Sequence, residues 1–185
     1  MMTRIKMYGL GGQGVVTAAK ILSVVVSVYE DKYAITVPAY GHERRGAPVY
    51  TDMVIDEERV LQNCYVYEPD LIVIFDDGLI DKKVDVGAGS HDDTVVIINT
   101  TNDETVNRYK EAFGFKNVFK VGATDIAVKN IGLNIPNSAM LGAIAKSGYA
   151  KIESVEKAVT EYFGAKGGDK NATTARESYE DTKAC

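Results

Sequence analysis

The stretch that most constrains the fold of this chain is YGLGGQGVVTAAK, residues 8–20, in which four glycines separate two apolar segments. A short apolar run leads into the glycines, and a segment without helix breakers, Val15–Tyr29, follows them. Glycine is needed where the backbone takes a positive φ or approaches a neighbour closely. The pattern predicts a strand at Arg4–Tyr8, a tight turn, and a helix over Gln13–Val28.

Such a turn leaves free backbone N–H groups at the start of the helix, where an anion binds favourably. The spacing Gly9-x-Gly11-x-x-Gly14 also matches the dinucleotide fingerprint, which requires an acidic residue after the second strand. The second predicted strand, Tyr33–Val37, is followed by Pro-Ala-Tyr, so that acid is missing and NAD binding is disfavoured. Two interpretations stay open: an anion seat, or a turn that only packs helix against sheet.

Downstream, apolar runs alternate with segments of helical period. Strands are predicted at Val49–Ile55, Leu71–Phe75, Thr94–Asn99 and Asn117–Val121, and helices at about 101–113, 123–131, 137–147 and 154–163. Arg59–Gln62 is expected to return as a hairpin partner of Val49–Ile55. The alternation predicts an α/β fold, a single three-layer domain with a mostly parallel sheet and the Gly-rich first strand–helix turn. Residues 1–165 form this domain, and residues 166–185 are expected to be a polar C-terminal helix or arm, either solvated or docked on a partner.

Composition excludes several classes of protein. A chain of 185 residues fits one domain, and a net charge of −5 argues against nucleic-acid binding. Two cysteines, Cys64 and Cys185, and two histidines, His42 and His91, are too few and too scattered for a metal centre or an iron–sulfur cluster. The longest apolar run is too short to span a bilayer, and no signal-peptide core is present, so we expect a cytoplasmic protein that does not bind membranes.

One loop combines charge with glycine. Glu43-Arg44-Arg45-Gly46 follows the second strand and is expected at the same sheet edge as the first glycine turn. Arginine offers planar donors that suit phosphate or carboxylate, so the loop and the turn together predict an anion site. The alternative is that Glu43 and the arginines pair with each other or with a partner subunit. No nucleophile–base–acid arrangement stands out, and Asp76-Asp77, which ends a buried strand, is best explained as a turn cap.

These segments carry a family resemblance. Residues 11–20 (GGQGVVTAAK) and 43–49 (ERRGAPV) strongly resemble the gamma subunit of 2-oxoacid:ferredoxin oxidoreductases, and residues 136–143 (PNSAMLGA) are similar to a third shared segment. The matches are in order and span nearly all of the first 165 residues. The ERRGAP form is more similar to the pyruvate and branched-chain members than to the 2-oxoglutarate members.

The resemblance implies a non-catalytic subunit of an enzyme that oxidatively decarboxylates a 2-oxoacid, with pyruvate expected, to acyl-CoA and CO2. Thiamine diphosphate, Mg²⁺ and [4Fe-4S] clusters are expected in the partner alpha, beta and delta subunits, and ferredoxin accepts the electrons. This chain is expected to cover the active site and help bind coenzyme A, with no catalytic residue or metal ligand of its own. The positions that match the CoA-facing segments are Gly11, Gly12, Gln13, Gly14, Lys20, Arg44, Arg45 and Gly46. A free-standing nucleotide- or CoA-binding module without a redox role is the alternative.

Overall fold

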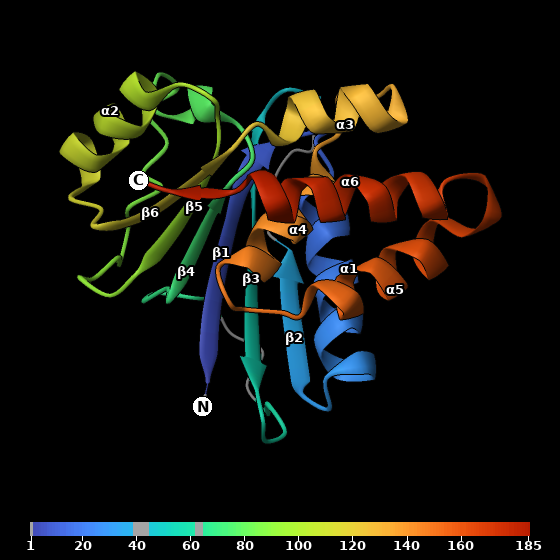
Figure 1. The fold of residues 1–185 in the computed structure, drawn as a ribbon. Helices are drawn as coiled ribbons and strands as arrows, with labels where there is room; N and C mark the ends of the chain where they lie inside the picture. The colour runs from blue at the N-terminus through green and yellow to red at the C-terminus, as the bar shows by residue number, and fades with distance from the viewer. Residues whose placement is uncertain (1, 39–44, 62–64) are drawn as a thin grey trace.

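The computed structural model describes residues 2–38, 45–61 and 65–185, and it shows a seven-stranded sheet with helices on both faces (Figure 1). The strand order is β2-β3-β1-β4-β5-β6-β7. The strands are β1 (Thr3–Leu10), β2 (Tyr33–Pro38), β3 (Pro48–Asp56), β4 (Leu71–Ile74), β5 (Val95–Asn99), β6 (Asn117–Val121) and β7 (Lys183–Ala184). Strands β1, β4, β5 and β6 pair in parallel, which confirms the predicted α/β class and its parallel core.

Six helices surround this sheet unevenly. They are α1 (Val15–Tyr29), α2 (Asp103–Phe113), α3 (Ala123–Ile131), α4 (Asn137–Lys146), α5 (Ile152–Phe163) and α6 (Gly168–Asp181), with 3-10 turns at Asp77–Leu79 and Gly164–Lys166. One core cluster joins one face of the sheet to α1, α3, α4, α5 and α6, and a smaller cluster joins the other face to α2 (Figure 1). Within the part of the chain that the structure describes, no helix has the length and apolar character to cross a membrane.

The expected hairpin between Arg59–Gln62 and the strand at 49–55 is wrong. Strand β3 instead pairs antiparallel with β1 on one side and with β2 on the other. Both edges of β3 are therefore occupied, and residues 59–61 form no strand, while Gln62 lies outside the described residues. The insertion of β3 between β2 and β1 makes this end of the sheet antiparallel.

The polar C-terminal segment folds back into the domain as α6. Helix α4 is buried over nine consecutive residues, 137–145, because α6 covers the side that faces away from the sheet. The two helices approach closely at Gly142, where an added Cβ would lie 2.0 Å from the backbone oxygen of Ala175. The segment expected to be a solvated or partner-docking arm therefore contributes buried residues such as Thr174, Ala175 and Ser178. The chain then ends in β7, antiparallel to β6.

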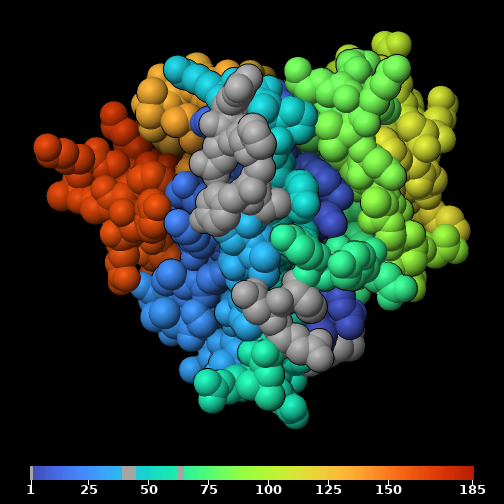
Figure 2. Space-filling view, turned by 180° about the vertical axis from the view of Figure 1, so that it is seen from behind, coloured from blue at the N-terminus to red at the C-terminus, as the bar shows by residue number. Residues whose placement is uncertain are grey.

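No described helix covers β2 and β3 on the face opposite α1, which is the face seen in Figure 2. A buried ion pair lies there: the Lys6 ammonium is 3.6 Å from Asp52 Oδ1, and the Asp52 side chain is fully buried. The two side chains also hold the backbone of Val66 in place. Lys6 Nζ donates to the Val66 carbonyl (2.9 Å), and the Val66 N–H donates to Asp52 Oδ2 (3.1 Å). Burial raises the pKa of Asp52, while the Val66 N–H and Lys6 lower it only in part.

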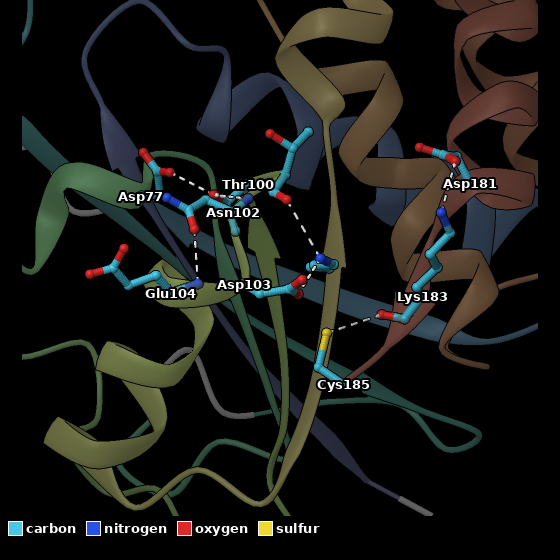
Figure 3. A network of polar contacts seen from close by, with 10 residues as sticks. Asp77, Thr100, Asn102, Asp103, Glu104, Asp181, Lys183 and Cys185 are labelled. Atoms are coloured by element: carbon cyan, nitrogen blue, oxygen red, sulfur yellow. Dashed lines mark hydrogen bonds and ion pairs between the residues drawn. The ribbon is translucent and has the colours of Figure 1, made fainter.

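The carboxyl ends of β4 and β5 are tied together by polar side chains (Figure 3). Thr100 donates to Asp77 Oδ2 (2.7 Å), Asn102 caps α2 by accepting the N–H of Glu104 (2.8 Å), and Lys120 contacts Asp103. Asp76 caps the following 3-10 turn by accepting the Gly78 N–H at 3.1 Å. Asp76 thus acts as a turn cap, as the sequence predicted, whereas the side chain of Asp77, the first residue of the turn, accepts from Thr100 and caps no turn.

Candidate functional site

The glycine turn connects β1 to α1 as predicted. Gly12 has φ 101° and Gly14, the N-cap of α1, has φ 77°. Glycine adopts these positive φ values without steric cost because it has no Cβ. Gln13 closes the turn from within: its Oε1 accepts the Leu10 N–H (2.8 Å), and its Nε2 donates to Asp76 Oδ2 (2.8 Å). Both polar groups of the Gln13 side chain are therefore used in hydrogen bonds that fix the turn next to the residue that follows β4, Asp76.

The turn and the arginine loop lie side by side. The Gly11 N–H donates to the carbonyl of Ala47 (2.8 Å), and the Gly46 N–H donates to the carbonyl of Gly11 (3.0 Å). Arg45 Cγ lies 3.7 Å from where a Cβ on Gly12 would stand. The structure thus brings Gly11, Gly12, Arg45 and Gly46 together. Arg44 and Glu43 lie outside the described residues.

A pocket of about 1080 Å³ opens directly beside this junction. It is lined by Leu10, Gly11, Gly12, Gly14, Val15, Val16, Thr17, Arg45, Val49, Ile131, Leu133, Ile135, Asn137, Tyr162, Phe163, Lys166, Gly167, Lys170 and Asn171. Among the described residues, the lining contains three cationic side chains and no carboxylate, although the whole chain carries a net charge of −5. One wall is apolar. A concave site with positive charge and an apolar wall is suited to an anionic ligand that also has an apolar part.

Lys20 does not line this pocket. It lies on α1 one turn beyond Val16 and Thr17, and its side chain is exposed. Of the predicted site residues, Gly11, Gly12, Gly14 and Arg45 line the pocket, Gln13 supports its rim, and Gly46 is hydrogen bonded to Gly11.

Sequence reasoning missed the second half of the lining, on α4 and α6. Asn137 belongs to the PNSAMLGA segment, which indicated family membership but no role for this side chain. Lys166, Lys170 and Asn171 belong to the segment taken for a separate arm. Their only signal in the sequence was a pair of lysines around Gly167-Gly168, which by itself is typical of a solvated helix start.

The described residues contain no group of three His, Cys, Asp or Glu side chains placed to hold a metal ion. Cys185 is free and exposed at the C-terminus, far along the chain from Cys64, which is outside the described residues.

The fold and site define an α/β domain whose glycine-rich strand–helix turn lies beside a cationic pocket, with no metal centre among its described residues. Comparison with known proteins gives its family: residues 4–181 match the pyruvate ferredoxin/flavodoxin oxidoreductase model, and the chain belongs to that family. It is 44% identical over 185 residues to the pyruvate/ketoisovalerate oxidoreductases common subunit gamma of Pyrococcus abyssi, covering 98% of each chain. It is 42% identical to the pyruvate synthase subunit PorC of Methanothermobacter marburgensis, covering 98% of each.

A solved structure is similar over the whole length. The pyruvate oxidoreductase subunit PORC of Thermotoga maritima superposes with a TM-score of 0.86 at 30% identity, covering 99% of this chain and 98% of that one. The resemblance to gamma subunits drawn from the glycine turn, the arginine loop and the PNSAMLGA segment is confirmed. This protein is a gamma-type subunit of a pyruvate or 2-oxoacid ferredoxin oxidoreductase.

Proposed function

We propose that this chain binds coenzyme A for a cytoplasmic 2-oxoacid:ferredoxin oxidoreductase and covers the active site that its partners build. The reaction is the oxidative decarboxylation of a 2-oxoacid, with pyruvate as substrate, to acyl-CoA and CO2. Electrons pass to ferredoxin, and the partners are alpha, beta and delta subunits. The observation that carries the proposal is the junction of the Gly11–Gly14 turn with Arg45 beside a cationic pocket.

The redox cofactors are assigned to the partner subunits. Clusters of the [4Fe-4S] type require four thiolates, and this chain has two cysteines in all. Thiamine diphosphate brings a Mg²⁺ ion that needs carboxylate or carbonyl oxygens, and the part of the pocket lining that the structure describes has no carboxylate. The described residues therefore do not fit these groups, and no step of the chemistry is assigned to this chain.

The proposal predicts an effect on coenzyme A alone. In the assembled enzyme, Arg45→Ala should raise the KM for CoA roughly five- to tenfold, because a charge-assisted phosphate contact at an open site is worth somewhat less than ~1.4 kcal/mol. The KM for the 2-oxoacid should hardly change. Lys82→Ala, which removes an exposed lysine outside the pocket, is the matched control. Unchanged CoA kinetics in the Arg45→Ala variant of an intact complex would leave the loop of Arg45 and Gly46 as an assembly surface only.

The alternative is a free-standing nucleotide- or CoA-binding module without a redox role, which would use the same pocket. Purification from native cells separates the two. Co-purification with a thiamine-binding chain and an iron–sulfur chain supports the subunit, whereas recovery as a lone monomer that binds CoA supports the module.

A further inference from the structure

Strand β2 forms one edge of the sheet, and no described strand pairs with its outer side. The free N–H and C=O groups of such an edge can pair with another chain, and proteins usually guard it with a very short strand, a lysine or a cover. The opposite edge is guarded in this way, because β7 has only two residues and one of them is Lys183. Strand β2 has six residues, Tyr33–Pro38, and none of them is charged. Among the described residues, its outer side is therefore open to a further strand.

Helix α1 runs along this edge of the sheet (Figure 1). Ser23 Oγ lies 2.7 Å from Thr36 Oγ1, so the middle of the helix is beside the middle of β2. Lys20, Ser23 and Ser27 follow one another at helical spacings of three and four, which places them on one side of α1. Lys20, Ser27 and Asp31, which follows the helix, are exposed. The side of α1 toward the edge therefore has small residues in its middle, a cation in its first half and an anion after its end.

A second copy of the chain fits this surface through a two-fold axis that is perpendicular to the sheet at Ile35. The two β2 strands then pair antiparallel, and both α1 helices lie on the same face of one continuous sheet. Helix α1 packs over β2 and β3, and neighbouring strands are about 4.8 Å apart. The axes of the two α1 helices are then about 10 Å apart, which is close to the roughly 8–10 Å of packed helices. The small side chains of Ser23 and Ser27 allow this approach.

The same axis brings opposite charges together. The two α1 helices run antiparallel, so Lys20 of each copy approaches the end of the other helix, where Asp31 lies. The midpoint between these two residues is about 4 Å along the helix from Ser23, at ~1.5 Å per residue. Because α1 and β2 run in opposite directions, the same shift leads from Thr36 to Ile35, which is one residue or about 3.3 Å along the strand. The axis that pairs the strands is thus also the axis that pairs the charges.

We propose that the outer edge of β2 and the adjoining side of α1, together the β2–α1 surface, bind a second copy of this chain. Strand pairing joins the two sheets, and two symmetric contacts between Lys20 and Asp31 flank the axis. The inference goes beyond the proposed function and does not rest on it, because none of these residues lines the pocket. It gives a role to Lys20, which is exposed and lies outside the pocket.

Analytical ultracentrifugation of the full chain over a range of concentrations measures the dissociation constant of the dimer. We expect Lys20→Glu and Asp31→Lys each to weaken dimerisation roughly tenfold, because each reversal puts like charges together at two symmetric places. The double variant Lys20→Glu/Asp31→Lys should recover the wild-type affinity, because it restores both contacts with the charges exchanged. Lys82→Glu, which reverses an exposed lysine outside the β2–α1 surface, is the matched control and should change nothing.

Ile35→Lys tests the strand pairing. It places two lysines opposite each other at the axis and should weaken dimerisation more than about tenfold. In hydrogen–deuterium exchange, the amides of β2 should exchange more slowly in the wild-type dimer than in the monomer obtained by dilution. Thermal melting of each variant separates lost association from lost folding, and the charge reversals at exposed positions serve if Ile35→Lys does not fold.

Zero-length coupling of amines to carboxylates tests for the same contact in the assembled oxidoreductase. Within one copy, Lys20 and Asp31 are about 16 Å apart along α1, at ~1.5 Å per residue, which is too far for direct coupling. A cross-link between Lys20 and Asp31 therefore joins two copies, and we expect to find it by mass spectrometry of the wild-type enzyme.

The possible results separate the parts of the proposal. A chain that is monomeric at every concentration overturns it, as does a dimer that neither charge reversal weakens. A dimer that the double variant does not recover overturns the contact of Lys20 with Asp31, and with it the axis. Unchanged exchange of the β2 amides overturns the strand pairing. Cross-links from Lys20 to a different subunit, without the link to Asp31, overturn the second copy as the occupant. None of these results bears on CoA binding, for which Arg45→Ala remains the test.

Discussion

Replacing Gly142 by alanine is expected to destabilise the protein by about 3 kcal/mol, the upper end of the usual cost of overpacking a core. The added Cβ would stand 2.0 Å from the oxygen of Ala175 and 3.1 Å from the nitrogen of Tyr179, both backbone atoms of α6. Backbone cannot rotate away as a side chain can, so α6 must move off α4. The melting temperature should fall by roughly 6–12 °C, at ~2–4 °C per kcal/mol for a domain of this size.

Gly167→Ala is the control for this prediction. Its added Cβ would meet nothing closer than 3.5 Å, and its φ of −147° is open to any residue. We expect a change within about 0.5 kcal/mol, as for ordinary substitutions away from special features. If Gly142→Ala and the wild type had the same melting temperature, α6 would not be fixed on α4. Because α6 carries Lys170 and Asn171, which line the pocket, Gly142→Ala should also lower the affinity of the pocket for any ligand.

Replacing Lys6 by methionine is expected to cost about 3 kcal/mol of stability at neutral pH, since removing one partner leaves a buried charge uncompensated. Asp52 is fully buried, and among the described residues its Oδ1 has no hydrogen-bond partner, only the ammonium of Lys6 at 3.6 Å. The same substitution removes the bond from Lys6 to the Val66 carbonyl. The double variant Lys6→Met/Asp52→Asn should recover most of the loss, because it removes the charge and keeps an oxygen for the Val66 N–H.

The pH dependence of this effect has a definite sign. Burial holds the pKa of Asp52 above its unfolded value, so this carboxyl adds stability at pH below its unfolded pKa, and that stability is lost as pH rises through its folded pKa. Lys6 lowers the pKa of Asp52, so Lys6→Met raises it further. The loss of stability in Lys6→Met should therefore shrink as the pH falls toward the raised pKa of Asp52, because protonation relieves the buried charge.

Chemical denaturation at several pH values measures this dependence. Lys116→Met is the control, because Lys116 and its partner Asp92 are 60% and 79% exposed, and exposed pairs contribute about 0–1 kcal/mol. A loss in Lys6→Met that is as small as in the control would show that water or a rearranged side chain compensates Asp52. A loss independent of pH would show that packing, and not charge, makes Lys6 necessary.

The local elements of this protein follow from the sequence alone. The glycines at 11, 12 and 14 fix a strand–turn–helix unit because glycine adopts the positive φ values of Gly12 and Gly14 without the steric cost that a side chain brings. The helices at 103–113 and 123–131 end at Gly114 and Gly132, which take left-handed conformations that stop a helix. These are short-range effects of backbone sterics and hydrogen bonding, and so they can be predicted from neighbouring residues.

Tertiary structure decided everything that depends on pairing between distant segments. An alternating strand such as β3 carries no mark of which neighbour it will pair with, and its place between β2 and β1 excluded the expected hairpin. The polar residues of α6 resemble a solvated helix, and only docking at Gly142 buries Thr174 and Ser178. The pocket joins Gly14, Asn137 and Lys170. Gly14 and Asn137 are more than a hundred residues apart along the chain. Sequence spacing predicts an anion at the glycine turn, and only the packing of α4 against α1 and of α6 against α4 determined which other side chains line the pocket beside the turn.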